Sequence, residues 1–296
     1  MYVVCFGDGL GNQMFQYAFY KSLINNYPDN CIKADIFFIY GKRIHNGFEL
    51  KNIFGIDLDV CDNGEALILA ENCPKYMKYW IYKLLHKVRR KIHGYKDSYI
   101  SQDDPTGYYE DVYHLSTVKS YIFRGNWVNE KYFKNIRAEL LKDFCFPCFD
   151  EEWNIVYSDE MKKCNSVSVH IRKGDYINSD MINLDKDYYK RAKYFIENSV
   201  ENPKYYIFTD DKNAIAEYLD LFDDYTIVKG NCGNKSYRDM QLMALCKHNI
   251  IANSTFSFWG AYLNINESKI VIAPSKAKFD FRHPFACEGW TIIEVG

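Results

Sequence analysis

Long apolar runs and an excess of one charge are both missing from this sequence. It has no stretch of about 18 apolar residues, the length that a membrane-spanning helix requires. Lys and Arg number 37 against 39 Asp and Glu, a formal net charge of -2. This balance argues against a protein that grips nucleic acid along its whole surface, so we expect no nucleic-acid partner.

Signals for zinc binding and for export are missing as well. Of the ten cysteines, Cys145 and Cys148 form the one C-x-x-C pair, which lacks a second half and histidines at zinc spacing. We therefore expect mainly buried, free thiols. The first residues show neither the basic nor the apolar segment of a secretory signal, which favours a reducing cytoplasm.

The apolar content is sufficient for two domains. The chain has 296 residues and is 48% hydrophobic, which supports a sizeable core. An apolar run at 3–6, three glycines and a helical pattern at 14–23 predict a strand, a tight turn and a helix. Residues 31–34 predict a second strand, whereas 36–150 show no clean alternation.

The second half has a clearer pattern, in which short apolar runs alternate with helical stretches. Strands are predicted at 167–171, 205–208, 225–228, 249–252 and 270–273, and helices at about 187–198, 212–222, 237–246 and 256–263. This alternation predicts a parallel sheet covered on both faces, with ligands outside the carboxyl ends of its strands. We expect two domains, 1–160 and 161–296.

Two polar segments follow predicted strands. In the segment from His170 to Tyr176, Arg172 emerges where its strand ends, and an arginine fork suits a diphosphate. The alternative is a local surface ion pair with Asp175. Asp210 and Asp211 follow another strand, where one carboxylate could cap the next helix or accept hydrogen bonds from guanine. Metal binding by this pair is the weakest interpretation.

A third polar segment, Asn253 to Gly260, follows a strand and begins a helix. A helix N-terminus rich in hydroxyl groups is a ready anion site, because N–H groups, dipole and side-chain donors act together. The alternative is an ordinary cap with an aromatic core helix behind it, which explains Phe258 and Trp259 well. Three such segments at one sheet edge favour a pocket for a nucleotide diphosphate.

Four motifs resemble those of the bacterial α-1,2-fucosyltransferases of glycosyltransferase family 11. They are Gly9-Leu10-Gly11-Asn12-Gln13-Met14-Phe15-Gln16-Tyr17-Ala18, Gly125-Asn126-Trp127 with Glu130-Lys131-Tyr132-Phe133, the segment His170 to Tyr176, and the segment Asn253 to Gly260. The matches follow the family's order over nearly the whole chain. A ten-residue match supported by others at fitting places is a specific signal.

The resemblance implies a GT-B-like α/β fold, with two facing Rossmann-like domains, parallel sheets and the donor bound mainly by the second domain. It implies an inverting reaction without a metal or other cofactor. The β-linked fucose of GDP-L-fucose becomes α-linked to a hydroxyl of a galactose-terminated glycan, through an α-1,2 linkage. A bacterial surface polysaccharide is the expected destination.

Residue roles follow from the same resemblance. Arg172 is expected to hold the β-phosphate and stabilise the departing GDP, and Asp175 is the other candidate catalytic residue, with a structural bond to its turn as the alternative. The side chains expected to contact the nucleotide sugar are Asn12, Gln13, His170, Arg172, Asp210, Ser254, Thr255, Phe256 and Ser257. Two residues depart from the family pattern: Lys173 replaces a second arginine, and Asp8 replaces a glycine.

Two other classes of protein fit part of the sequence. Glycines 7, 9 and 11, with Asp35 further on, imitate a nicotinamide-dinucleotide fingerprint, although Asn12 stands where the third glycine belongs. That oxidoreductase interpretation leaves the polar segments of the second half unexplained. A non-catalytic protein that binds sugar nucleotides or glycans is the other alternative, because fold does not imply function.

Residues 75–96 form a basic stretch with apolar residues at helical spacing on one side and no acidic residue. Such a helix can lie on an anionic membrane, so we expect a cytoplasmic protein that associates peripherally with the inner face of the membrane. The alternative, in which the helix packs its apolar side on the domain core, is the stronger one.

Overall fold

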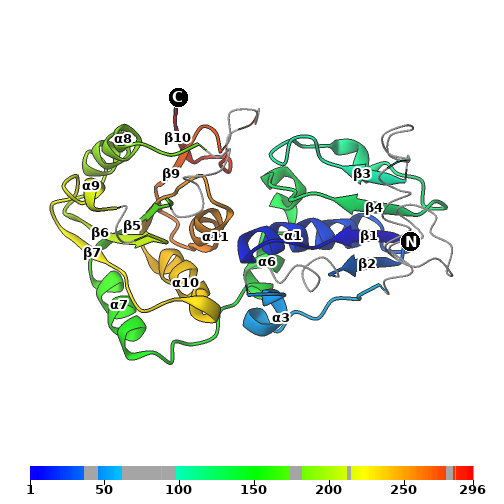
Figure 1. The fold of residues 1–296 in the computed structure, drawn as a ribbon, viewed down its shortest axis with the longest axis horizontal. Helices are drawn as coiled ribbons and strands as arrows, with labels where there is room; N and C mark the ends of the chain where they lie inside the picture. Colours follow the sequence, from blue (N-terminus) through cyan, green and yellow to red (C-terminus); the bar gives the residue numbers. More distant parts are fainter. Residues whose placement is uncertain are drawn as a thin grey trace. The chain divides into compact units, whose positions relative to one another are not determined.

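The computed structural model divides into two compact units, Met1–Trp127 and Val128–Gly296 (Figure 1). The structure describes residues 1–36, 46–61, 88, 98–173, 182–211, 215–277, 283 and 285–295. Within these residues, no helix is both long enough and apolar enough to cross a bilayer.

The first unit is built on a four-stranded sheet with the strand order β2-β1-β4-β3. All its strand pairs are parallel, and the strands are β1 (Tyr2–Cys5), β2 (Ile32–Asp35), β3 (Tyr99–Ser101) and β4 (Tyr121–Arg124). Its helical elements are α1 (Leu10–Asn26), α3 (Glu49–Phe54) and the 3-10 turn η1 (Glu110–Tyr113). The predicted strand, turn, helix and second strand are therefore confirmed.

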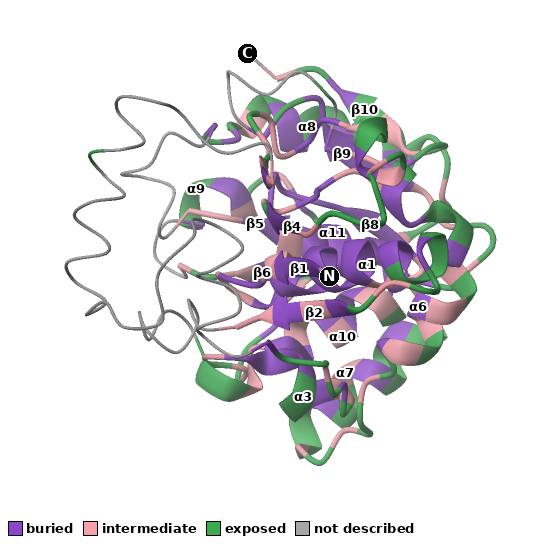
Figure 2. Ribbon diagram, turned by 90° about the vertical axis from the view of Figure 1, so that its right-hand side faces the viewer, coloured by how far each residue is buried: buried purple, intermediate pink, exposed green. Residues whose placement is uncertain are grey.

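Helix α1 is buried along most of its length, as its purple colour in Figure 2 shows. Its aromatic side chains pack on the sheet and on the loop after β4. The Phe19 ring stacks on the fully buried Trp127 ring, with centroids 3.9 Å apart. Because two buried glutamines, Gln13 and Gln16, lie on the same helix, its interior face also holds polar contacts.

The second unit contains a six-stranded, wholly parallel sheet with the order β10-β9-β8-β5-β6-β7. Its strands are β5 (Asn165–Ile171), β6 (Pro203–Thr209), β7 (Tyr225–Ile227), β8 (His248–Ile250), β9 (Val271–Pro274) and β10 (Thr291–Ile293). Its helical elements are η2 (Glu130–Tyr132), η3 (Lys134–Ile136), α6 (Arg137–Asp143), α7 (Glu152–Lys163), α8 (Lys186–Glu197), α9 (Ala216–Leu219), η4 (Gly233–Lys235), α10 (Tyr237–Leu245) and α11 (Thr255–Leu263). The five predicted strands are present, and β10 is an additional edge strand.

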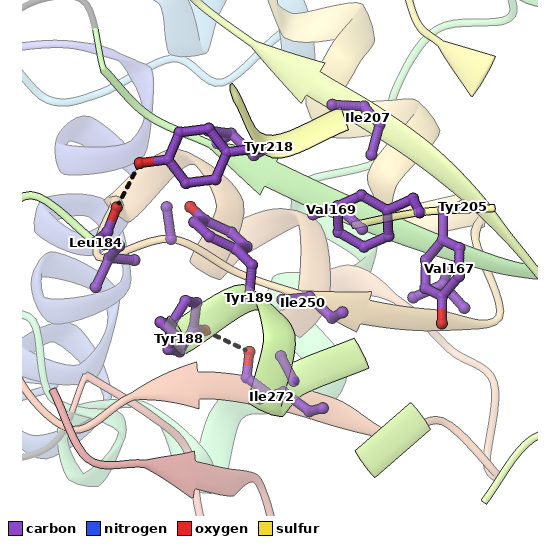
Figure 3. Packing of buried hydrophobic residues seen from close by; sticks show 14 of the residues in the cluster. Val167, Val169, Leu184, Tyr188, Tyr189, Tyr205, Ile207, Tyr218, Ile250 and Ile272 are labelled. Carbon is purple, nitrogen blue, oxygen red and sulfur yellow. Dashed lines mark hydrogen bonds between the residues drawn. The ribbon is translucent and has the colours of Figure 1, made fainter. Parts of the chain in front are cut away.

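Both faces of this sheet are covered. On one face, α8 and α9 bury a cluster that includes Val169, Tyr188, Tyr189 and Ile250 (Figure 3). The buried Tyr188 hydroxyl donates to the Ile251 carbonyl at 2.6 Å, which satisfies it inside the apolar layer. On the other face, α7 and α10 contribute Met161, Leu242 and other residues to a second cluster with β6.

The boundary between the compact units lies at 127/128, and the domain border expected at 160/161 stays a prediction. Residues 128–160 pack on the second unit because their side chains find partners there. The Phe133 ring lies 5.6 Å from the Trp259 ring, and Arg137 donates to the Tyr262 carbonyl at 2.8 Å. The buried Arg238 guanidinium binds the Pro147 carbonyl at 2.7 Å in the same way.

Candidate functional site

The order of the second sheet changes direction at β5. From β5 the chain continues outward through β6 and β7 on one side, and from β8 it continues outward through β9 and β10 on the other. The register pairs Val167 with His248 and Val169 with Ile250. The carboxyl ends of β5 and β8 therefore emerge side by side, at the point where open α/β sheets bind ligands.

Arg172 leaves this edge directly after β5 and is fixed by a carboxylate from the neighbouring strand. Its Nε lies 3.0 Å from Asp210 Oδ2, and the Lys173 backbone N–H donates to Asp210 Oδ1 at 3.0 Å. The Arg172 and Asp210 side chains are about one-quarter exposed. Asp210 thus aligns the guanidinium at the edge of the sheet, and the alternative ion-pair partner Asp175 lies outside the described residues.

Neither Asp210 nor Asp211 is the N-cap residue of the next helix. Helix α9 begins at Ala216, and its N-cap is Ile215, which makes no side-chain cap hydrogen bond. Instead, the Asp211 N–H donates to Thr209 Oγ1 at 3.1 Å, which closes a tight turn after β6. The prediction that one of these aspartates opens the helix is therefore wrong, because the chain first turns after β6 and α9 begins only at Ala216. Lys173 Nζ donates to the Leu184 carbonyl at 3.2 Å and lies 4.8 Å from the centre of the Tyr218 ring.

His170 is the last-but-one residue of β5 and is 4% exposed. Its backbone carbonyl accepts the Tyr189 hydroxyl at 3.0 Å, and its ring centre lies 6.2 Å from that of Phe256. Burial, with a contribution from the Arg172 charge, lowers the pKa of His170 to about 3. Its Nδ1 is buried and has no hydrogen-bond partner among the described residues. At neutral pH the site therefore holds an uncharged imidazole with an unused polar atom.

Helix α11 begins at the same edge, after β8. Its N-cap is the buried Ser254, in extended conformation, and this side chain makes no cap hydrogen bond. Ser257 Oγ points back to the carbonyls of Ala252 and Ser254, at 3.4 and 3.3 Å. Because the first turn carries N–H groups without a side-chain cap, an anion can take their hydrogen bonds.

The rest of the α11 segment is structural. Asn253 Nδ2 donates to the carbonyls of Ile182 and Ala277, at 2.8 and 3.0 Å, and so ties three loops together below the helix. Gly260 allows close packing on α10, since a Cβ there would come within 2.7 Å of Met243 Cβ. Phe258 and Trp259 are buried, as an aromatic core helix predicts.

In the first unit, Asn12 lies half-buried in the first turn of α1, while Gln13 is fully buried. Gln13 Nε2 donates to the carbonyls of Asp8 and Gly47, at 2.9 and 2.8 Å, and its Oε1 accepts the Glu49 N–H at 2.9 Å. The amide therefore holds the glycine loop in place. Contact of Asn12 or Gln13 with a ligand stays a prediction.

Sequence reasoning assigned no role to Gln16, although it lies in the quoted ten-residue motif. Gln16 Oε1 accepts the Gly7 N–H at 2.9 Å, and its Nε2 donates to Gly125 O and Asn126 Oδ1, both at 3.3 Å. It therefore connects the loops that follow β1 and β4. The available signal was an amide three residues after Gln13, on the same side of a mostly apolar helix.

Comparison with known proteins identifies the family. The model of the family described as "Glycosyl transferase family 11" matches residues 96–294. The chain belongs to glycosyltransferase family 11. An alpha-1,2-colitosyltransferase of Escherichia coli is 31% identical over 274 residues, covering 90% of this chain and 89% of the relative. A galactoside 2-alpha-L-fucosyltransferase of Caenorhabditis elegans is 32% identical over 157 residues, covering 47% of this chain and 41% of the relative.

Solved structures resemble this family 11 chain in fold. The NodZ alpha-1,6-fucosyltransferase soaked with GDP-fucose has a TM-score of 0.50 and 14% sequence identity, covering 88% of this chain and 92% of that chain. The expected family and the GT-B-like α/β fold with parallel sheets are thus confirmed. Membership of a glycosyltransferase family also removes the basis for the oxidoreductase alternative.

The buried imidazole of His170 predicts a specific dependence of stability on pH. Its folded pKa is lowered from 6.5 to about 3, so the unfolded chain binds the extra proton between these values. This contribution is fully present above pH 6.5 and is lost as pH falls towards 3, with a slope of at most about 1.4 kcal/mol per pH unit. Urea denaturation at pH 4–8 should show this slope in the wild type and a shallower slope in His170→Asn.

The matched substitution at the exposed His114 serves as the control. Because that imidazole is in contact with water in the folded chain, His114→Asn should reproduce the wild-type profile. Equal slopes for His170→Asn and wild type would contradict a buried neutral imidazole at the sheet edge.

Proposed function

We propose that this family 11 glycosyltransferase transfers L-fucose from GDP-β-L-fucose to a hydroxyl of a galactose-terminated glycan, forming an α-1,2 linkage with inversion. The observation that carries the proposal is Arg172, held by Asp210 at the sheet edge from which α11 also begins, and α11 has no side-chain cap there. A guanidinium and a helix N-terminus at one switch point suit a nucleotide diphosphate. The names of the nematode relative and of NodZ support fucose and GDP-fucose respectively.

In this proposal the second unit stabilises the leaving group. The bond from fucose C1 to the β-phosphate oxygen breaks, and its electron pair leaves with GDP. Arg172 and the first N–H groups of α11, with the hydroxyls of Ser254 and Thr255, meet the developing negative charge. The acceptor oxygen attacks C1 from the opposite face, which converts the β-linkage to α, and Asp175 is the proposed acceptor of its proton.

Neutral His170 suits a donor contact in the same site. An uncharged ring adds no positive charge beside Arg172, and its unused Nδ1 offers one hydrogen-bond position. Phe256 lies next to this ring and is partly buried, so it limits access of water from the α11 side. Asp210 is proposed to contact the guanine base through the carboxylate lone pairs that remain beside its bonds to Arg172 and Lys173.

Metal independence is part of the proposal. The Asp210 carboxylate already binds a guanidinium and a backbone N–H, so its negative charge is compensated by the protein without a cation. No group of three or more His, Cys, Asp or Glu residues in the described part of the chain could hold a metal ion. Arg172 and the α11 N-terminus supply the positive charge that a divalent cation provides elsewhere.

A GDP-colitose donor is the second candidate, because of the E. coli colitosyltransferase that is similar over most of both chains. Colitose is the 3-deoxy form of L-fucose, so the two donors differ in one hydroxyl group. A site with a hydrogen-bond partner for that hydroxyl would discriminate strongly between them. Another E. coli relative, the O-antigen biosynthesis glycosyltransferase WbnK, is 28% identical over 92% of this chain, which supports a surface polysaccharide as the destination.

Loss of the Arg172 guanidinium should remove transfer while leaving the fold intact. For Arg172→Ala we expect kcat/KM with GDP-fucose and lactose to fall by roughly 10²–10³, the usual cost of removing one well-placed donor to a developing charge. Arg172→Lys should be intermediate, because it keeps the charge and loses the planar fork. All assays contain EDTA, and calorimetry compares binding of GDP-fucose, GDP-colitose, GDP-mannose, UDP-galactose and NAD.

The matched control is Arg191→Ala on the exposed side of α8, which removes another guanidinium that is paired with an aspartate, since Arg191 Nε lies 2.8 Å from Asp187 Oδ2. It should transfer fucose at the wild-type rate. Wild-type activity in Arg172→Ala would contradict the assigned role, and activity that returns only when metal is added would contradict metal independence. Binding of GDP-fucose without transfer to any glycan would instead indicate a binding protein.

We also propose a cytoplasmic protein that associates peripherally with anionic membrane through residues 75–96. Apart from Val88, this basic stretch lies outside the described residues. The support is its charge and apolar periodicity. Replacement of Lys83, Lys87, Arg89 and Arg90 by Glu should abolish sedimentation with anionic liposomes, and unchanged sedimentation would remove the membrane proposal.

A further inference from the structure

The first sheet has a switch point of its own between β1 and β4. The loops after these strands, at residues 7–9 and 125–127, meet there because Gln16 binds both of them. Parallel sheets of this kind bind ligands at such a point. If the second unit binds the nucleotide sugar, as proposed above, the sugar acceptor is left for the first unit.

Asp8 occupies the tip of the first of these loops in a left-handed backbone conformation, with φ of +62°. Side chains other than glycine adopt this conformation at a cost, although aspartate and asparagine tolerate it best. Two buried amides enforce it from below. Gln13 binds the Asp8 carbonyl, and Gln16 binds the N–H of Gly7. The backbone at Asp8 is therefore determined by α1, independently of the Asp8 side chain.

Among the described residues, no contact of the Asp8 carboxylate explains its presence. It is half-buried and forms no hydrogen bond or ion pair with any residue in the part of the chain that the structure describes. The N-cap of α1 is Gly9, and no side chain caps this helix. A carboxylate thus stands at the carboxyl edge of a parallel sheet, in a conformation that glycine would adopt more easily, and it has no partner among the residues that the structure describes.

We propose that Asp8 is a specificity-determining residue that accepts hydrogen bonds from the acceptor glycan. An ionised carboxylate has two oxygens and only accepts, so it suits two neighbouring hydroxyl groups of a neutral pyranose. It disfavours acceptors that carry a carboxylate or phosphate at the same place, because like charges repel. This inference rests on the proposed function, and it places the choice of acceptor in the loop between β1 and α1.

Asp8→Gly is the decisive variant because it relaxes the backbone and removes the carboxylate. Its melting temperature should equal or exceed that of the wild type. The KM for lactose should rise roughly ten- to hundredfold, as expected for loss of charge-assisted hydrogen bonds, while the KM for GDP-fucose stays within about twofold. Asp8→Asn keeps one carbonyl acceptor and should show a smaller rise.

Asn202→Gly is the matched control. Asn202 also has a positive φ, +45°, and lies exposed in the turn before β6. This variant relieves the same kind of strain away from the first unit, so it should leave both KM values unchanged. The expected result is an Asp8→Gly variant that is at least as stable as the wild type and has a higher KM for lactose, whereas Asn202→Gly leaves both KM values unchanged.

Lactose binding to the GDP-loaded protein, measured by NMR, separates failure of this inference from failure of the proposed function. Transfer with an unchanged lactose KM in Asp8→Gly overturns the role of Asp8 alone. If the wild type binds lactose and Asp8→Gly does not, but the wild type transfers no fucose, only the proposed reaction is overturned. If the wild type neither binds nor fucosylates any neutral galactoside, the role of Asp8 and the proposed reaction are both overturned.

Discussion

The pairing of β5 with β8 is the contact on which the candidate site depends. It joins strands that are distant in the sequence, and the sheet grows outward from this pair in both directions. Arg172 and the N-terminus of α11 consequently reach the same edge from separate parts of the chain. Any substitution that weakens this register would separate the guanidinium from the helix terminus, even without touching either of them.

The strands of the second unit could be predicted from the sequence because they are continuous apolar runs, as buried parallel strands usually are. Residues 167–171, for example, fall within β5. Strand β10, at Thr291–Ile293, lies at the edge of the sheet and was not among the predicted strands. The strand pattern also predicted the positions of Arg172 and of the α11 N-terminus at the carboxyl edge, although their contacts with a ligand stay predictions.

Contacts between distant residues could not be predicted. Asp210 had three interpretations from the sequence, and none of them was the ion pair with Arg172, because that pair exists only after β5 and β6 align. The two glutamines of α1 illustrate the same limit. Their motif was recognisable, but the loops that they hold come from residues 7–8, 47–49 and 125–126. The assignment of residues 128–160 to the second unit likewise depends on side-chain packing between distant parts of the chain.

The most direct test of the account is the contribution of the β-phosphate to nucleotide binding, measured by calorimetry with GDP and GMP in the presence of EDTA. The account predicts that the wild type binds GDP about tenfold or more tightly than GMP, because Arg172 and the α11 N-terminus meet the additional phosphate. The difference should largely disappear in Arg172→Ala. Equal affinity of the wild type for GDP and GMP would contradict a diphosphate site at the edge between β5 and β8.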